Sequence, residues 1–586
     1  MSVSAPKVAP LQPAEAVPRH LRRFVVEQDY SQYNVVDQAV WRFVLKHTHA
    51  RLISTAHPAY HSGLSATGIS LERIPSIEEM NERLARFGWG AVCVDGFLPP
   101  RAFQSFQAER ILPIAGEIRT REHLVYTPAP DIIHEASGHA PILTDPVFSR
   151  YVQRMGWLGR QAFTLPSEER VYQAIYNLSE IKENPASDAA KVQQAEAELA
   201  LAVKHAGEPS EAARLSRLYW WTAEYGLIGR PEAYQIYGAG LLSSLWESYS
   251  CHAASVSKRV LDETCMDVAY DITRTQPVLF VVPSFEALHG LLDRVERGMA
   301  AQVGGRYALE HATRSAEPAT FEFESGARLY GVLNGFAGER TKRLQFGGSV
   351  RAVWRMGEPS IALGADLCIV AGRTLDGQGL AEWMVQGSHG ASGRVQVQFA
   401  EGTSLVGRLA AQAVTGPDGA ARCLQLEDVE LRSPDSPPRF FREYTLLALG
   451  EFVTARAGAD SDLERELSLY ERTLSTEQKT PSPWRVPRVR VFAEPELRLQ
   501  ALYSRWERVR ESAFAEQSME IRALYAALAE YPNEWLLRLQ LLQGATRMPE
   551  LADLQRTLRG ELERLELLFE GREPIETGLR EVGHAA

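Results

Sequence analysis

The segment Thr127–His139, with the sequence TPAPDIIHEASGH, constrains this chain more than any other stretch. It places two imidazoles, His134 and His139, five residues apart. On an ideal helix, at about 100° per residue, these side chains point about 140° apart, so one regular face cannot present both. Gly138 and Pro141 are the residues that permit the helix to loosen here. We therefore predict a distorted helix end that brings the two imidazoles together.

A third candidate ligand is Glu224, in an aromatic helical stretch that ends at Gly226. A carboxylate is costly to bury among aromatic neighbours unless it is paired or bound to a metal. Two imidazoles and one carboxylate leave half of an octahedron open, as in non-haem Fe(II) oxygenases. The spacing argues against a metalloprotease, whose His-Glu-x-x-His motif needs histidines four residues apart. These residue types predict an enzyme that activates oxygen.

Other interpretations of the same residues stay open at this point. Taken singly, each histidine could be a packed core residue, and Glu224 could be a solvated carboxylate at a helix end. The three ligands also fit a zinc-dependent hydrolase, with a metal-bound water and Glu135 as general base. A third hypothesis is a catalytically degenerate protein whose C-terminal half binds partners or acts as a scaffold.

Several motifs, in the same order along the chain, resemble the pterin-dependent aromatic amino acid hydroxylases, which comprise the phenylalanine, tyrosine and tryptophan hydroxylases. The resemblance covers residues 20 to 290, roughly half of the chain. It is carried by Asp29-Tyr30, Val36–Phe43, Ile118-Arg119, Thr127–His139, Tyr219–Gly226, Tyr237–Ser244 and Glu247.

The resemblance implies that His134, His139 and Glu224 bind Fe(II). It makes Arg119 the arginine that holds the amino acid carboxylate, a role that suits a planar guanidinium with two parallel donors. Ser243 would also support His134 from behind the metal. The positions that the resemblance assigns to the substrate pocket are Thr127, Pro130, Trp220, Gly240 and Ser243.

The resemblance also implies a site for a tetrahydropterin, either tetrahydrobiopterin or a related compound. Phe103 would stack on the pterin ring, and Gly96 and Leu98 would contact it through their backbones. Glu135, beside the first histidine, would face the pterin as the catalytic residue of the site. The expected reaction is hydroxylation of the ring of a free aromatic amino acid, phenylalanine above all, with O2, Fe(II) and the pterin.

Three departures from the family pattern affect what can be carried over. Ala129 replaces a glutamate that is usual in the motif, and Tyr225 follows the third ligand where phenylalanine is common. Both changes bear on pocket shape and therefore on the choice of substrate. The stretch 179–216 is longer than in familiar members and rich in Ala, Glu and Lys, which predicts a helical insertion with a structural role.

Composition is that of an ordinary globular protein with several domains: 586 residues, 45% hydrophobic and 23% charged. Five scattered cysteines give no disulfide framework and no cysteine zinc site, which favours the cytoplasm. A net charge of −11 argues against non-specific nucleic-acid binding. No apolar run approaches the length of a membrane span. We therefore expect small-molecule partners, the amino acid and O2, and no membrane or nucleic acid.

The pattern of apolar residues divides the chain into four parts. We predict a flexible N-terminus over 1–20, a mainly α catalytic domain of the hydroxylase type over 21–310, a small β barrel or sandwich over 318–448 and a helical region over 451–586. Within the catalytic domain, helices are expected at 36–53, 77–87, 100–111 and 241–260. Near the C-terminus, the apolar seam could support a homo-oligomer, but its short length favours packing within the chain. The seam comprises Leu551, Leu554, Leu558, Leu565 and Leu568.

Overall fold

We analysed a computed structural model of the chain. The structure describes residues 17–94, 98–121, 124, 130–183, 189–271, 275–338, 342–354, 360–365, 367–372, 393–399, 402–415, 421–434, 436–447, 450–458, 492–568, 575–576 and 579. Gly96, Thr127 and most of the predicted N-terminal segment 1–20 lie outside these residues. In this part of the chain, no helix is long and apolar enough to cross a membrane.

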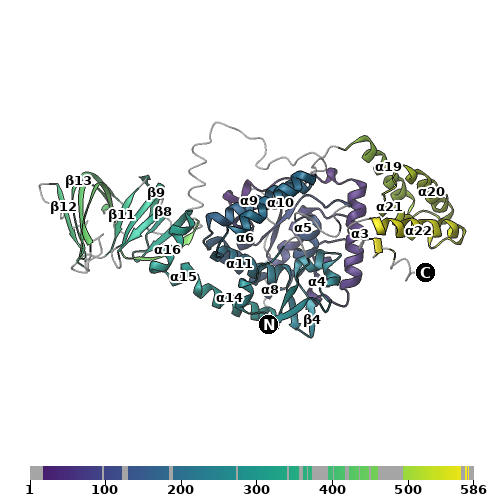
Figure 1. Ribbon diagram of the computed structural model, residues 1–586, viewed down its shortest axis with the longest axis horizontal. Coiled ribbons are helices and arrows are strands. Elements are labelled where there is room, and N and C mark those ends of the chain that lie inside the picture. The colour runs from purple at the N-terminus through teal and green to yellow at the C-terminus, as the bar shows by residue number, and fades with distance from the viewer. Residues whose placement is uncertain are drawn as a thin grey trace.

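The described residues form a helical part in the middle, a β part on one side and a group of C-terminal helices on the other (Figure 1). The middle part holds two small sheets, a parallel pair of β1 (Gly90–Val94) and β2 (Ile111–Ala115), and a four-stranded sheet in the order β4-β3-β6-β5. The strands of the second sheet are β3 (Leu227–Arg230), β4 (Ala233–Ile236), β5 (Ser257–Val260) and β6 (Val278–Val282).

Helices make up most of the middle part, as expected from the sequence. They are α2 (Arg19–Arg22), α3 (Val35–Leu52), α4 (Pro58–Ala66), α5 (Ile77–Leu84), α6 (Pro100–Ala108), α7 (Ala140–Ile142), α8 (Pro146–Gln161), α9 (Pro166–Glu183), α10 (Ala189–Lys204), α11 (Glu211–Tyr219), α12 (Ala239–Ser243), α13 (Glu247–Ser250), α14 (Phe285–Gly298), α15 (Ala300–Val303) and α16 (Gly305–Ser315).

Helix α3 shows how local sequence sets these elements. The Asn34 side chain accepts hydrogen bonds from the backbone of Val36 and Asp37, while Asp37 accepts one from Asn34, which closes a capping box. Trp41 is fully buried on this helix and donates through its indole nitrogen to the Ser70 carbonyl at 2.8 Å. The helix is therefore fixed both at its start and through its core face.

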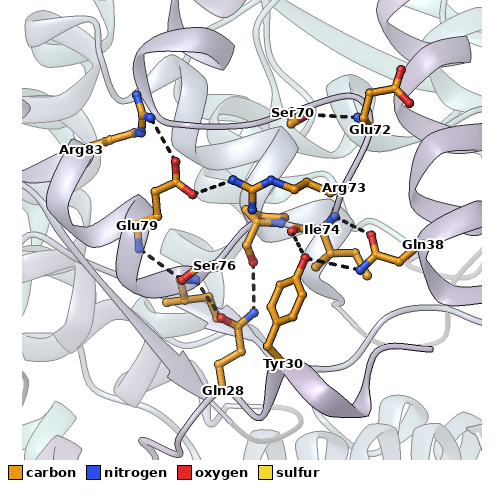
Figure 2. A network of polar contacts seen from close by, with 12 residues as sticks. Gln28, Tyr30, Gln38, Ser70, Glu72, Arg73, Ile74, Ser76, Glu79 and Arg83 are labelled. Atoms are coloured by element: carbon orange, nitrogen blue, oxygen red, sulfur yellow. Dashed lines mark hydrogen bonds and ion pairs between the residues drawn. The ribbon is translucent and has the colours of Figure 1, made fainter. Parts of the chain in front are cut away.

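The segment before α3, which carries part of the family-like sequence, is tied to the loop ahead of α5 (Figure 2). The Tyr30 hydroxyl donates to the Ile74 carbonyl at 2.7 Å, and Gln38 accepts from the Ile74 amide at 3.0 Å. Gln28 accepts from the Ile77 amide at 2.8 Å and donates to the Pro75 carbonyl at 3.1 Å. These hydrogen bonds fix the segment around Tyr30 and the start of α3 against the loop before α5.

One predicted helix of the middle part is wrong. The sequence between 241 and 260 forms the short helices α12 and α13 and then strand β5. The chain leaves α12 at Ser244, which is extended, and the Ser244 hydroxyl accepts from the Glu247 amide to start α13. A serine that caps the next turn outcompetes helix continuation here. Likewise, the helix predicted to reach residue 111 ends at Ala108, and β2 begins at Ile111.

The β part is one continuous sheet in the order β12-β13-β14-β15-β11-β9-β8-β7-β16, with β10 paired to β9. No pairing joins β12 to β16 among the described strands, so they do not close a barrel through those ends. Two separate apolar clusters lie along the sheet, one around Phe321 and one around Phe399. The strands are β7 (Pro318–Phe323), β8 (Arg328–Ala337), β9 (Lys342–Val353), β10 (Ile361–Ala365), β11 (Cys368–Ala371), β12 (Arg394–Gln398), β13 (Ser404–Thr415), β14 (Ala421–Ser433), β15 (Ser436–Leu447) and β16 (Phe452–Ala457).

The β part extends past the predicted boundary at 448. Residues 452–457, predicted as helix, form β16, which pairs antiparallel with β7. Phe452 and Ala455 are both buried there, although they are three residues apart, because the register shifts between Phe452 and Thr454 and brings both onto the core face. The remaining predicted helical residues up to 477 lie outside the described residues.

The C-terminal helices are α19 (Glu494–Val509), α20 (Phe514–Ala527), α21 (Leu536–Ala545) and α22 (Ala552–Leu568). Leu551, Leu554, Leu558 and Leu565 of the predicted seam are buried, in one apolar cluster with the other C-terminal helices and the middle part. The seam therefore packs within the chain, as its short length favoured. The side chain of Leu568 lies outside the described residues.

Candidate metal centre

His134 and His139 lie on a π-helical segment, Ile133–His139. A π-helix closes its hydrogen bonds between residues five apart, so positions i and i+5 lie nearly above one another. The two imidazoles face each other with ring centroids 5.0 Å apart. The predicted loosening of the helix is confirmed, and its form is a π-helix over Ile133–His139 rather than a loosened end.

Gly138 permits helix α12 to pack directly on this π-helical segment. A Cβ atom at Gly138 would lie 2.6 Å from the Ala239 carbonyl oxygen, which real side chains do not tolerate. The close approach brings Ser243, at the end of α12, beside His134. The backbone of α12 thus supports the π-helical segment from behind.

Ser243 fixes the tautomer of His134. The Ser243 hydroxyl has one proton, which it donates to the Ala239 carbonyl at 2.7 Å. It must therefore accept from His134 Nδ1, which lies 3.0 Å away. With the proton on Nδ1, the Nε2 lone pair of a neutral ring points toward the third candidate ligand.

Glu224 reaches the same point from a second π-helical segment, Trp220–Glu224. Its Oε2 lies 3.3 Å from His134 Nε2, and its Oε1 lies 3.1 Å from His139 Nε2. One ligand atom from each of the three residues lies within 4.8 Å of the others. Burial acts to raise the pKa of Glu224, but positive charge on protonated His139 and His134 outweighs it and holds this pKa well below its usual range, so Glu224 is an anion in a place that favours a cation.

The three residues fit a divalent metal ion. His139 Nε2 is buried and makes no hydrogen bond, and a neutral His134 directs a lone pair at a carboxylate. The His134 lone pair, the unbonded His139 Nε2 and the buried charge of Glu224 converge on one point, which suits a cation among them. Imidazole and carboxylate donors suit Fe(II) as well as Zn(II), so the ligand types alone do not choose between them.

Glu135 lies next to this group. Its Oε2 is buried without a hydrogen-bond partner and lies 3.9 Å from His139 Nε2. Burial raises the pKa of Glu135 to about 8, an effect that the nearby His139 reduces and Glu224 reinforces. The carboxyl is thus available for a further hydrogen bond at the metal centre.

Arg119 forms a two-point ion pair with Asp131, a residue to which the sequence had suggested no role. Arg119 Nε donates to Asp131 Oδ2 at 2.8 Å, and Nη2 donates to Oδ1 at 2.7 Å. Burial acts to raise the pKa of Asp131, and the Arg119 guanidinium outweighs it and lowers this pKa. Asp131 also accepts from the His134 amide at 3.0 Å, so it connects Arg119 to a metal ligand. Its place three residues before His134 is typical of a helix-capping aspartate, the signal that could have found it.

The aromatic residues around Glu224 form a stacked group. Trp220 stacks on Tyr225, with centroids 4.6 Å apart, and on Tyr270, at 4.2 Å. Tyr225 packs over Gly240, where a Cβ would lie 2.9 Å from its ring. The Tyr225 hydroxyl bonds the carboxyl of Glu247, whose pKa burial raises to about 8. Of the predicted pocket residues, Trp220, Gly240 and Ser243 thus come together around the ligands, and Pro130 is exposed at the start of the motif.

The predicted pterin residues are described in part. Phe103 on α6 is half-buried and meets Tyr219 edge to face, with centroids 5.7 Å apart. Tyr219 in turn stacks loosely on His139, at 6.5 Å. Leu98 packs with the apolar cluster around Phe106. A continuous run of rings therefore joins Phe103 to the metal centre.

Comparison with known proteins supplies the identity of this arrangement. Residues 26–174 and 187–314 match the family described as biopterin-dependent aromatic amino acid hydroxylase. A phenylalanine-4-hydroxylase from Ralstonia nicotianae is 32% identical over 268 residues, which cover 45% of this chain and 72% of that protein. The phenylalanine-4-hydroxylase of Mesorhizobium japonicum is 30% identical over 297 residues, covering 50% of this chain and 90% of that protein.

The chain belongs to the biopterin-dependent aromatic amino acid hydroxylases.

A solved phenylalanine hydroxylase from Chromobacterium violaceum, with bound iron(III) and 7,8-dihydrobiopterin, is 27% identical to this hydroxylase. The structural alignment covers 47% of this chain and 88% of the solved chain, with a TM-score of 0.35. As a member of the family, this hydroxylase is a pterin-dependent aromatic amino acid monooxygenase, and the zinc hydrolase hypothesis loses its support.

The family match of this hydroxylase is interrupted only between residues 174 and 187, a shorter stretch than the predicted insertion 179–216. The described residues of the predicted insertion are largely helical, as expected: they belong to α9, α10 and α11, and α9 packs against α10. Everything after residue 314, including the sheet and the C-terminal helices, lies outside the match.

Proposed function

We propose that this hydroxylase adds oxygen from O2 to the ring of free phenylalanine, with Fe(II) and a tetrahydropterin as cofactors. The relatives reported above are both phenylalanine-4-hydroxylases, which supports phenylalanine over the other aromatic amino acids. The observation that carries the proposal is the convergence of His134, His139 and Glu224 on one point in a chain of this family.

In this proposal, His134, His139 and Glu224 hold the iron. When bound, the iron and the pterin together supply oxygen activation and the two electrons of the reaction. Ser243 keeps the proton of His134 on Nδ1 and so leaves Nε2 for the metal. The two π-helical segments set the three donors on one side and leave the other side for substrate and cofactor.

Arg119 is proposed to bind the carboxylate of the amino acid. Asp131 accepts hydrogen bonds from Nε and Nη2 of the guanidinium. The pair of parallel donors that the sequence suggested for the substrate carboxylate therefore binds Asp131 instead. Nη1 remains for the substrate, and Asp131 acts by holding the guanidinium in one orientation. The substrate ring would lie against Trp220, Gly240 and Pro130, with Thr127 as a further pocket residue.

The pterin is proposed to lie near Phe103, whose ring faces the run of aromatic side chains that ends at His139. Gly96 and Leu98 would contact it through their backbones. Glu135 is proposed to hydrogen-bond the pterin, because its buried Oε2 has no partner within the protein. Exclusion of water by these aromatic side chains would protect the reaction from side products.

We also propose domain limits for this function. The catalytic domain spans 21–310, supported by the family match that ends at residue 314. The β part then runs from 318 to 457, and the helical region includes residues 494–568.

The proposal is tested by an assay of phenylalanine, tyrosine and tryptophan side by side, with the purified protein reconstituted with Fe(II) and tetrahydrobiopterin. The expected result is product formation that needs iron, pterin and O2, with the highest kcat/KM for phenylalanine. Iron-loaded protein that hydroxylates none of the three would overturn the proposed function. A higher kcat/KM for tyrosine or tryptophan would overturn the choice of substrate alone.

A further inference from the structure

The C-terminal helices lie against helix α3 of the catalytic part (Figure 1). Phe43 of α3 meets Trp535 edge to face, with centroids 5.3 Å apart, and Arg42 forms an ion pair with Glu507 of α19. The buried apolar residues of both parts belong to one cluster. The C-terminal helices are therefore a fixed part of the catalytic unit, although the family match ends before them.

Glu534, just before α21, is the most buried carboxylate of this contact, with 3% exposure. Its Oε1 accepts from the Tyr503 hydroxyl at 2.7 Å and from the Leu537 amide at 3.0 Å. These bonds fix the carboxylate within the C-terminal helices. Its other oxygen, Oε2, is directed out of the helices to pair with Arg121 of the catalytic part.

Arg121 lies two residues after Arg119, the proposed ligand of the substrate carboxylate. Three residues of extended chain span at most about 7 Å between the outer Cα atoms, so a shift at Arg121 is transmitted to Arg119. On its other side, Arg119 is fixed by Asp131 through its backbone amide and its guanidinium. The segment that carries Arg119 is thus held at one point by Asp131 and at another by Glu534.

A buried carboxylate strongly favours retention of its cation. Removal of one partner of such a pair leaves an uncompensated buried charge, which is far more costly than loss of a surface ion pair. The fixed Glu534 therefore restrains Arg121 more firmly than an exposed acid would. The restraint comes from a segment more than 400 residues away along the chain.

We infer that Glu534 is a positioning residue for substrate binding: through Arg121 it sets the place of Arg119, so the C-terminal helices complete the amino acid site. This inference rests on the proposed role of Arg119. It assigns the C-terminal helices a function in this reaction beyond coverage of an apolar surface.

The test is a steady-state comparison of full-length Glu534→Gln with the wild type. Glutamine can keep the acceptor for Tyr503 and Leu537 while it loses the charge that holds Arg121. We expect the KM for phenylalanine to rise about 10-fold, within the range of coupling between residues of one network. The KM for the pterin and the iron content should stay within about two-fold of the wild type, a split that a general loss of structure would not give.

The matched control is Glu507→Gln, which removes another ion pair of the same contact, the one with Arg42 of α3. It should leave both KM values unchanged. Arg121→Gln and the double variant Arg121→Gln/Glu534→Gln complete a cycle, in which the double variant should be no worse than either single variant. If Glu534→Gln fails to fold, Arg121→Gln, at a more exposed position, gives the same KM measurement.

Equal rises in both KM values, or no rise in the phenylalanine KM, would overturn the inference. Arg119→Lys, measured in parallel, separates this failure from that of the proposed function. If Arg119→Lys raises the phenylalanine KM and Glu534→Gln does not, only the role of Glu534 fails. If neither variant changes it, the proposed role of Arg119 fails as well.

Discussion

Replacement of Ser243 by alanine tests whether a single hydroxyl prepares His134 for the metal. In the wild type, the hydroxyl donates to Ala239 and accepts from His134 Nδ1, so the ring nitrogen that faces Glu224 carries no proton. Without the hydroxyl, Nδ1 loses its acceptor and the ring can turn or exchange tautomer. The substitution leaves the backbone of α12 in place.

The expected loss in iron affinity follows from the position of Ser243 one contact beyond the metal. Such partners contribute about 10-fold to 100-fold to metal affinity or activity. This range corresponds to about 1.4 to 2.8 kcal/mol of binding free energy. Loss of the two buried hydrogen bonds of this hydroxyl, both to neutral partners, should lower the stability of the metal-free protein by about 1–3 kcal/mol.

The assay is a chelator competition for Fe(II) under anaerobic conditions, with the melting temperature of the metal-free protein measured in parallel. Ser248→Ala is the matched control, because Ser248 is an equally buried serine whose hydroxyl donates to a backbone carbonyl and contacts no ligand. Iron affinity of Ser243→Ala equal to that of Ser248→Ala would refute the assignment of the tautomer.

Three further outcomes are expected. Glu224→Ala should abolish iron retention with the fold kept, and wild-type iron content by metal analysis would remove Glu224 from the site. Arg119→Lys should raise the KM for the amino acid strongly and that for the pterin little, since lysine cannot form the paired bonds to Asp131 that orient the cation; parallel rises would make Arg119 a general structural residue. Gly138→Ala places a methyl group 2.6 Å from the Ala239 carbonyl oxygen and should destabilise the protein by about 1–3 kcal/mol. The measurement is a melting curve of the metal-free protein, and an unchanged melting temperature would contradict this expectation.

The sequence predicted the three residues that converge, His134, His139 and Glu224, because metal-binding chemistry depends on residue type and spacing. The odd spacing of His134 and His139 even indicated a distorted helix. The second π-helical segment, under Glu224, carries no such signal, since only one of its residues is a ligand. The sequence does not reveal the ion pair of Asp131, because an aspartate just before a helix is already accounted for as a cap, and its contact with Arg119 shows only in the structure.

The errors in the fold arose where local patterns compete with distant contacts. Residues 452–457 form a strand rather than a helix because they pair with β7, more than 120 residues earlier in the chain. The contact between Arg121 and Glu534 joins segments more than 400 residues apart, and no periodicity records it. The apolar spacing of residues 241–260 predicts one helix, whereas the helix ends before Ser244, whose hydroxyl accepts from the Glu247 amide.

The shared apolar cluster has a consequence for synthesis of the chain on the ribosome. The catalytic part ends near Ser315, while the helices that cover α3 begin at Glu494. At about 5 to 20 residues per second, translation of the intervening stretch takes on the order of 10 to 35 s. During this interval, Phe43 and its neighbours on α3 lack the C-terminal helices that cover them, so the nascent hydroxylase exposes apolar surface of the kind that chaperones bind.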